Sequence, residues 1–142
     1  MEIRFENIIN KDCYRVSTCL FDTQPQTAAN YGVFFIASGP IEVMAVSESH
    51  GTIAGAAAIV TVEKLTTGQA KGSGVSILAT AFDLTGVKDT PLLKQASDLT
   101  KTNCTMLVGD RLAIKSTGTI AAVKDLCITV TYKLSGMGDY RI

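Results

Sequence analysis

Along most of this chain, apolar and polar side chains alternate with a period of two, which is the spacing of a half-buried β-strand. The clearest example is residues 125–134, where Leu126, Ile128 and Val130 alternate with Cys, Thr and Lys side chains. Polar or glycine-containing segments separate such stretches and predict turns. The other predicted strands are residues 14–21, 31–37, 41–49, 58–65, 75–84, 92–96, 104–108 and 111–115.

Residues 31–37 form a continuous apolar run instead of alternating. Such a run predicts a strand that is buried on both faces, or one that a neighbouring subunit covers. A Ser-Gly-Pro turn follows, and residues 41–49 then alternate, with Ile41, Val43 and Ala45 on one face. The two strands and the turn between them predict a β-hairpin.

Three further segments predict the elements between the main strands. Residues 66–74 contain three glycines and predict a loop. Residues 75–84 fit a strand somewhat better than a short helix around residues 78–82. The Ser-Thr-Gly-Thr sequence at residues 116–119 predicts a turn.

The number and spacing of these strands predict the fold class. Eight or nine short strands at intervals of about ten residues indicate an antiparallel β-sandwich of jelly-roll type. A length of 142 residues suits a single domain that spans residues 1–142. Residues 1–12 and 135–142 are predicted to be extended terminal arms that reach a neighbouring subunit.

Composition favours association with other proteins. Charged residues make up 18% of the chain, below the typical value of about 25%. The 13 basic and 13 acidic residues give a formal net charge of zero, so copies of the chain do not repel one another. The same balance leaves no basic cluster for nucleic acid or for an anionic membrane surface.

The sequence also suggests where the chain is made. No apolar run approaches the roughly 18 residues of a membrane helix, and no apolar leader segment follows Met1–Phe5. We therefore expect synthesis and assembly in the cytoplasm, with the cysteines reduced. Cys13, Cys19, Cys104 and Cys127 include no Cys-x-x-Cys pair, and with one histidine in the chain a structural zinc site is not expected.

The single histidine, His50, is the first candidate for chemistry. It lies next to Glu48 and Ser49 at a predicted strand end, where it would act as a general base or form part of a polar turn. The turn is the preferred interpretation, because the chain has no Gly-x-Ser-x-Gly nucleophile elbow. No catalytic residue is therefore assigned, and the chain is predicted not to be an enzyme.

Two other patterns carry weak chemical signals. Gly68–Gly74 superficially resembles a phosphate-binding loop, but it lacks the Gly-Lys-Ser/Thr sequence and is interpreted as a flexible connection. No calcium-loop pattern is present, so no metal or cofactor site is assigned, although one Asp per copy could form a metal site on a symmetry axis. The Asp residues near predicted loops are Asp83, Asp89, Asp98, Asp110 and Asp125.

Aromatic residues would be needed for a glycan site on a β-sandwich. The chain has no Trp, and aromatic residues total 6%. Aromatic residues within strands more often pack in a core. A carbohydrate-binding role is therefore not indicated by these residues, which are Tyr14, Tyr31, Phe34, Phe35 and Tyr132.

Two segments carry a resemblance to a known class of proteins. Residues 60–84, together with residues 107–134, look like small structural proteins of tailed phages, described as head decoration, head fibre or minor virion proteins. In the second segment the similar stretches are Val108–Ile114 and Ile128–Leu134. The resemblance covers roughly residues 31–134 and implies a jelly-roll fold, frequent trimeric assembly, and attachment to a capsid or tail.

The sequence therefore predicts a capsid decoration or cement protein that stabilises the head shell as a homo-oligomer, with a trimer favoured. Its expected partners are other copies, the major capsid protein or another virion protein, and its expected location is the virion, after assembly in the host cytoplasm. The alternative is a tail or fibre module that recognises a host-surface glycan. A small jelly-roll hydrolase or isomerase that uses His50 is a third hypothesis.

Overall fold

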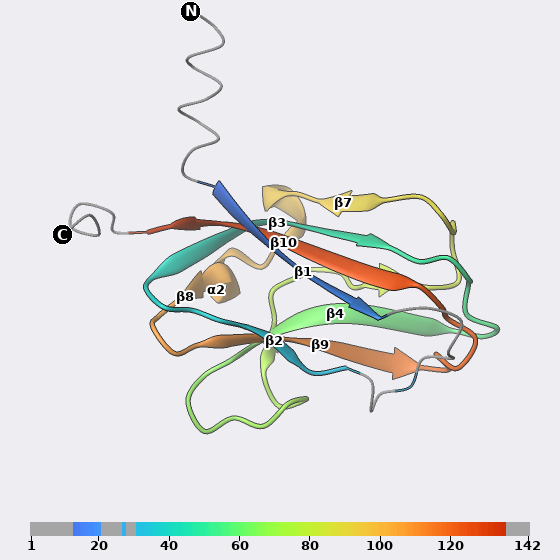
Figure 1. Cartoon of the computed structure of the whole chain (residues 1–142), viewed down its shortest axis with the longest axis horizontal. Coiled ribbons are helices and arrows are strands. Elements are labelled where there is room, and N and C mark those ends of the chain that lie inside the picture. The colour runs from blue at the N-terminus through green and yellow to red at the C-terminus, as the bar shows by residue number, and fades with distance from the viewer. Residues whose placement is uncertain (1–12, 21–26, 28–30, 136–142) are drawn as a thin grey trace, which may run out of the picture.

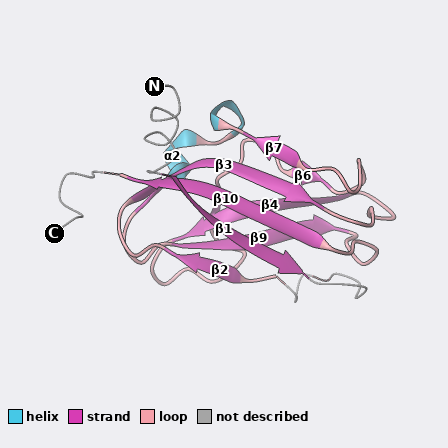
Figure 2. Ribbon diagram, turned by 45° about the horizontal axis from the view of Figure 1, so that its top comes forward, coloured by secondary structure: helices cyan, strands magenta, loops and turns pink. Residues whose placement is uncertain are grey.

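Two antiparallel β-sheets packed face to face form the part of the chain that the structure describes (Figures 1 and 2). The structure is a computed structural model, and it describes residues 13–20, 27 and 31–135. Both terminal arms predicted from the sequence lie outside this part, apart from Ser135. Within the described residues, no helix has the length and apolar character needed to cross a bilayer.

Each sheet has five strands. The first sheet contains β1 (Cys13–Leu20), β10 (Leu126–Leu134), β3 (Ile41–Ser49), β7 (Leu92–Lys94) and β8 (Thr105–Met106). The second sheet contains β2 (Val33–Ile36), β9 (Arg111–Gly118), β4 (Ala58–Leu65), β5 (Val75–Ser76) and β6 (Phe82–Asp83). A short 3₁₀ helix, Ala96–Asp98, and the helix α2, Lys101–Cys104, connect β7 to β8.

The strand order is that of a jelly roll. The order is β1-β10-β3-β7 in the first sheet and β2-β9-β4-β5 in the second, while β8 also pairs with β3 and β6 also pairs with β4. Six of the nine connections between successive strands cross from one sheet to the other, as in the two Greek keys of a jelly roll, whereas β4–β5, β5–β6 and β7–β8 stay within one sheet. The predicted antiparallel sandwich of jelly-roll type is confirmed.

The core lies between the sheets and is filled by alternate residues of the long strands. Each buried aliphatic side chain of this kind contributes about 1.5–3 kcal/mol relative to an exposed one. The first sheet supplies Val43, Val46, Ile128 and Val130, and the second supplies Val60, Val62, Leu112 and Ile114.

A β-bulge in β3 changes which side chains enter this core. Opposite β10, Val43 pairs with Tyr132 but Ala45 pairs with Thr131, so Met44 is the extra residue. The bulge shifts the alternation by one residue. Ile41 and Val43 face inward before it, and Val46, Glu48 and His50 are the buried residues after it. The sequence placed Ala45 on the face of Val43, which is wrong beyond the bulge.

The predicted hairpin over residues 31–49 is also wrong. β2 pairs with β9 in the second sheet, whereas β3 pairs with β10, β7 and β8 in the first. The Ser-Gly-Pro turn therefore carries the chain between sheets. The apolar strand β2 is not buried on both faces either, because it lies at a sheet edge, where Val33 and Ile36 are exposed.

Two smaller predictions need correction. Residues 116–119 do not form a separate turn, because β9 continues to Gly118 and pairs with β4 along its whole length. Residues 75–84 form neither one strand nor a helix. They contain the two-residue strands β5 and β6, and the irregular segment between them leaves the sheet.

Candidate functional site

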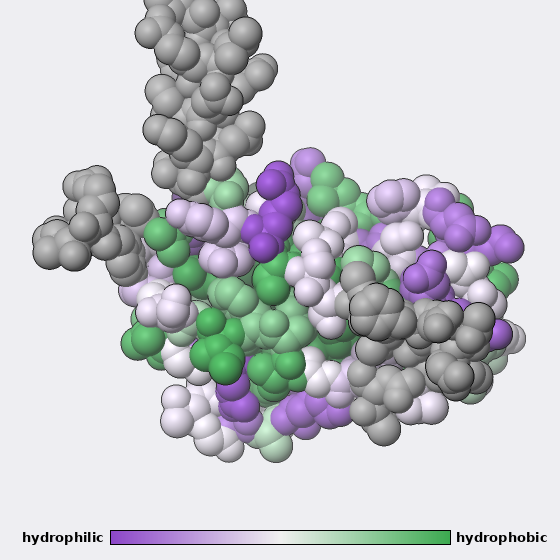
Figure 3. Space-filling model, in the orientation of Figure 1, coloured by the Kyte–Doolittle hydropathy of each residue, from purple (hydrophilic) through white to green (hydrophobic). Residues whose placement is uncertain are grey.

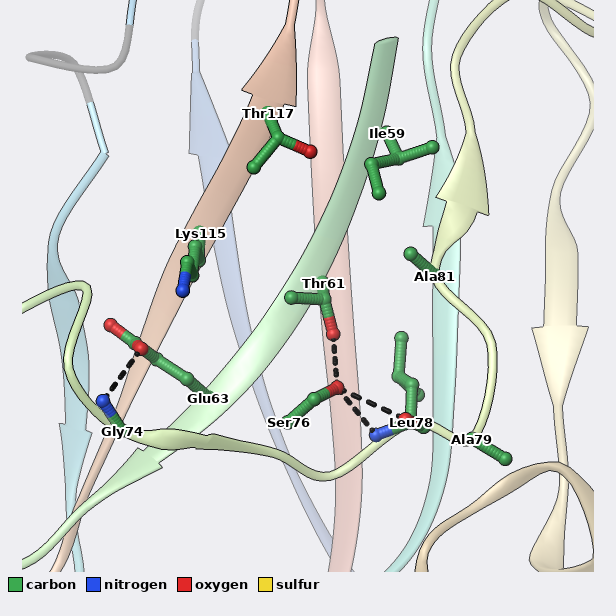
Figure 4. A pocket seen from close by; sticks show the side chains of 10 residues that line it. All are labelled: Ile59, Thr61, Glu63, Gly74, Ser76, Leu78, Ala79, Ala81, Lys115 and Thr117. Carbon is green, nitrogen blue, oxygen red and sulfur yellow. Dashed lines mark hydrogen bonds between the residues drawn. The ribbon is translucent and has the colours of Figure 1, made fainter.

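A shallow groove of about 310 Å³ lies on the outer face of the second sheet (Figure 4). Its floor is built by the outward-facing residues of β4 and β9, and its wall by the segment that leaves the sheet between β5 and β6. We call it the outer groove. It is lined by Ile59, Thr61, Glu63, Gly74, Ser76, Leu78, Ala79, Ala81, Lys115 and Thr117.

The polar groups of the outer groove are mostly bound to one another. The hydroxyl groups of Thr61 and Ser76 are 2.5 Å apart, and the Ser76 hydroxyl also donates to the carbonyl oxygen of Leu78 (Figure 4). The Lys115 ammonium donates to the carbonyl oxygen of Gly72 at 3.1 Å. Exposed apolar surface remains, above all at Ile59, which is 44% exposed. The groove therefore suits an apolar ligand better than a charged one.

Glu63 connects the outer groove to the glycine-rich loop. Its carboxylate is buried and accepts hydrogen bonds from the backbone N–H groups of Gly72, at 2.5 Å, and Gly74, at 3.1 Å. A side chain at Gly74 would place its Cβ atom 2.2 Å from the carbonyl oxygen of Lys64, so only glycine fits this close approach. The loop does bind an anion, but the anion is a carboxylate of the same chain. The flexible connection predicted here is instead braced by hydrogen bonds.

His50 lies inside the sandwich and not in a polar surface turn. Its Nδ1 atom is 2.7 Å from Oε1 of Glu48, and both side chains are fully enclosed. Burial raises the pKa of Glu48, and the hydrogen bond and charge of His50 lower it to a smaller extent. Burial, with a contribution from the Glu48 charge, also raises the pKa of Tyr31 to about 12. The preferred interpretation of His50 as a turn residue is wrong, because the bulge in β3 turns this end of the strand inward.

Among the residues that the structure describes, four buried side-chain atoms have no hydrogen-bond partner, and two of them belong to the Glu48–His50 pair. Within the described residues, Oε2 of Glu48, Nε2 of His50, the Tyr31 hydroxyl and the Ser116 hydroxyl are buried without a hydrogen-bond partner. A substrate could reach the Glu48–His50 pair only if the sandwich opened. His50 therefore has the carboxylate partner that a general base needs, but the pair is not accessible to a substrate in this structure.

The five aspartates lie in or next to loops and turns, as expected, and the carboxylates of Asp83 and Asp98 accept hydrogen bonds from nearby residues. The Asp83 carboxylate accepts from the Thr85 hydroxyl and backbone N–H, and these two bonds lower its pKa. The Asp98 carboxylate accepts from the backbone N–H of Gln95. In the described part of the chain, no group of three or more His, Cys, Asp or Glu side chains is placed to hold a metal ion.

Three aromatic side chains close the sandwich where the edge strands β1 and β2 approach each other. The rings of Tyr14 and Tyr132 stack with centroids 5.7 Å apart, and Phe35 lies 4.9 Å from Tyr132. The prediction that aromatic residues pack in the core holds for Tyr31, but Tyr14 is 45% exposed.

The cysteines divide between core and sheet. Cys104 is buried in α2, and its burial raises the thiol pKa to about 11, as expected of a small core residue. Cys127 lies in β10, where its register partner in β1 is Cys19.

Large apolar side chains are exposed at one end of the sandwich. Ile36 is 64% exposed, and Leu107 and Val108, in the turn between β8 and β9, are 64% and 67% exposed. Backbone bonds from Gly109 to Ala37 and from Ala37 to Asp110 join this turn to the end of β2. We call Ile36, Leu107 and Val108 the apolar tip. Figure 3 shows further apolar surface over the region where β1, β10 and β2 lie in Figure 1.

Comparison with known proteins gives similarity at the level of the fold. No family model and no curated protein sequence matches the chain. A chain from the capsid asymmetric unit of cyanophage Pam1 is 15% identical, with a TM-score of 0.53, and the match covers 87% of this chain and 85% of that one. A chain of the disulfide-linked pili of Bacillus endospore appendages is 18% identical, with a TM-score of 0.36 and coverage of 87% and 89%.

A third similar structure comes from infectious bursal disease virus, strain Gx. It is 14% identical with a TM-score of 0.39, and the match covers 91% of this chain and 31% of that one. At these identities the likeness concerns the fold and carries over no functional residue. The cyanophage match, which spans most of both chains, supports the jelly-roll assignment made from the strand order.

Proposed function

We propose that this chain is a virion structural protein, and more specifically a capsid decoration or cement protein that binds the head shell as a homo-oligomer and stabilises it. A trimer is the favoured oligomer, and the major capsid protein or another virion protein is the partner. The expected location is the virion, after assembly in the host cytoplasm.

One observation carries this proposal. Large apolar side chains are exposed at one end of a jelly roll whose fold is similar to that of a cyanophage capsid chain. The apolar tip exposes about two-thirds of each of its three side chains. Apolar surface of this kind, gathered at one end of a domain, is more often an interaction site than scattered single residues are. The fold-level likeness to the cyanophage capsid chain favours a virion as the assembly to which it belongs.

Charge and site chemistry support the same role. Zero net charge favours close packing of like copies and gives no footprint for nucleic acid or an anionic membrane, so we expect contact with neither. The Glu48–His50 pair is enclosed by the core, and the outer groove uses its carboxylate to hold a loop. These arrangements support a non-catalytic protein.

A cement protein would act by mechanical means. It would bridge adjacent capsid subunits and bury enough area that the subunits resist separation by the packaged genome. Stable contacts of this kind bury about 1,200–2,000 Å² in total. Repetition across a lattice strengthens contacts that are individually weak.

A binding experiment tests the proposal. Purified chain is mixed with undecorated capsids of the virus whose genome encodes it, and with capsids that already carry their full complement. The proposal predicts saturable binding to the undecorated capsids and none to the complete ones. Failure to bind any component of the particle would refute it.

The alternative, a glycan-binding tail or fibre module, receives less support. Glycan sites on β-sandwiches usually offer an exposed aromatic ring, and none lines the outer groove. Specific binding on a glycan array, together with location on the tail, would favour this alternative.

A further inference from the structure

Two cysteines face each other across the strands at one edge of the first sheet. β1 pairs antiparallel with β10, and in this register Cys19 is the direct partner of Cys127 (Figures 1 and 2). We propose that these two cysteines form a disulfide bond in an oxidising medium, and that this bond locks the edge strand β1 to the sandwich. The inference goes beyond the proposed function, because it concerns the covalent chemistry of the sheet and not its partner.

The backbone register alone sets a distance that suits a disulfide. Directly opposed residues of antiparallel strands have Cα atoms about 4.5 or 5.5 Å apart, depending on whether they exchange backbone hydrogen bonds. Disulfide-bonded residues have Cα atoms about 4.4–6.8 Å apart, so either kind of pair fits. The pairing of β1 with β10 advances one residue at a time, from Cys13 opposite Lys133 to Leu20 opposite Leu126, so the two cysteines stay in line.

The row of pairs that contains the two cysteines lies on the outer face of the first sheet. Ile128 and Val130 of β10 point into the core, so Cys127 and Thr129 belong to the opposite face. Two positions away from the cysteines, the hydroxyl oxygens of Ser17 and Thr129 are 2.7 Å apart, so directly opposed side chains of this row can reach each other. Cys127 is half-buried, which gives a small oxidant access to the pair.

The other two cysteines have different surroundings. The register partner of Cys13 is Lys133, which cannot form a disulfide. Cys104 is buried in α2, and its thiol donates to the carbonyl oxygen of Ile77 at 3.7 Å. Burial also raises the pKa of the Cys104 thiol to about 11, so little of the thiolate that attacks a disulfide is present at neutral pH. The fold therefore selects one pair from the four cysteines of the chain.

The bond forms by exchange with a small disulfide, for which glutathione disulfide serves. The thiolate of one cysteine attacks it, forms a mixed disulfide and releases one glutathione thiolate. The thiolate of the second cysteine then attacks the protein sulfur of the mixed disulfide and releases the other. Two protein thiols thereby lose two electrons and two protons, and glutathione disulfide is reduced to two molecules of glutathione. A reducing cytoplasm should keep the pair as thiols, and oxidising surroundings should close it.

The bond would constrain both the unfolded chain and the edge of the sheet. The segment between the two cysteines contains every strand from β2 to β9. Closure of a longer loop removes more conformational freedom from the unfolded chain. In the part of the chain that the structure describes, β1 pairs only with β10. We therefore expect oxidation to stabilise the fold and to slow the local opening of β1.

Peptide mapping identifies the bond. The full chain is purified in reduced form, equilibrated with mixtures of reduced and oxidised glutathione, alkylated, and cleaved after Lys and Arg. This cleavage places the four cysteines in separate peptides, and those that contain Cys19 and Cys127 span residues 16–64 and 125–133. These two peptides, joined, should be the dominant disulfide species of the folded chain. The equilibrium constant for their joining should fall at least tenfold in urea, where the register is lost.

Hydrogen exchange at the β1 amides tests the lock. Oxidation of the wild type should slow exchange at these amides at least tenfold. Cys19→Ser and Cys127→Ser should each show no such change. The matched control is Cys13→Ser, which removes a thiol from the same strand but outside the pair, and it should respond as the wild type does. Circular dichroism checks that each variant keeps the wild-type β spectrum.

Several results would overturn the inference. The joined peptides could fail to form in an excess of oxidised glutathione, Cys13 or Cys104 could pair in equal yield, or the equilibrium constant could be the same in urea. Joined peptides without slower exchange at β1 would refute the lock. Capsid binding by the reduced chain is measured separately. Saturable binding without the disulfide would reject this inference and preserve the proposed function, whereas the disulfide without binding would do the reverse.

Discussion

The Glu48–His50 pair gives a prediction whose magnitude follows from the geometry. The two side chains are fully enclosed, and Nδ1 of His50 lies 2.7 Å from Oε1 of Glu48. Substitution of His50 by Leu would leave the carboxyl group buried without this partner. Removal of one member of a buried pair typically costs about 3–5 kcal/mol. Substitution of Glu48 by Gln keeps an oxygen that accepts from Nδ1–H and removes the buried charge, so we expect its stability to stay within about 1 kcal/mol of wild type.

The pH dependence of the Glu48→Gln variant provides a second readout. In the unfolded chain the Glu48 carboxyl has its ordinary pKa of 4.5, and burial raises the pKa in the folded protein. As the pH rises above 4.5, the unfolded chain therefore releases its proton first. The protonated Glu48 carboxyl group therefore contributes to the stability of the folded wild type. This contribution is fully present below the pKa of the unfolded chain, and it is lost as the pH rises through the higher pKa of the folded protein. The stability of Glu48→Gln relative to wild type should therefore increase from acidic to neutral pH.

Urea unfolding followed by circular dichroism measures both effects, at several pH values between 4.5 and neutrality. The double variant Glu48→Gln, His50→Leu completes a mutant cycle and isolates the coupling between the two side chains. A loss below about 1 kcal/mol for His50→Leu would contradict a buried, paired carboxyl group. So would a Glu48→Gln variant that is destabilised as much as His50→Leu.

Four other substitutions test three separate parts of the structure by the same unfolding assay. Gly118→Ala should cost about 2–5 kcal/mol, because its Cβ atom would lie 2.2 Å from a backbone oxygen at a φ of +89°. Gly109→Ala, at the same φ in open space, should cost only about 1–2 kcal/mol, and equal losses would refute the steric argument. Glu63→Gln should cost about 1.5–3 kcal/mol and speed hydrogen exchange at the loop amides it binds; unchanged exchange would contradict their bracing role. Tyr31→Phe should change stability by less than about 1 kcal/mol, since its hydroxyl has no partner among the described residues, and a larger loss would show that it has one.

Local pattern predicted the long strands well because their alternation reflects burial on one side. β4 has the predicted bounds, and β10 begins one residue later than predicted. The connectivity could not be read in the same way. A Ser-Gly-Pro turn looks the same whether it joins two strands of one sheet or carries the chain to the other sheet, and in this fold it does the latter.

The candidate sites depended on features that have no local signal. The bulge at Met44 exchanges the two faces of β3. Without it, the period-two alternation would place Val46, Glu48 and His50 on the face opposite to Ile41 and Val43. With it, these three side chains are buried in the core. Glu63 is buried because amide groups that follow it by 9 and 11 residues converge on its carboxylate. Such pairings are set by tertiary structure, which a period-two pattern does not describe.

A cryo-electron microscopy reconstruction of the virus particle whose genome encodes this chain tests the central claim most directly. We predict ordered jelly-roll density at regular positions on the head, with Ile36, Leu107 and Val108 covered by neighbouring protein chains. Purified particles that do not contain the chain, or density in which these side chains face solvent at every position, would contradict a role that depends on packing against other subunits.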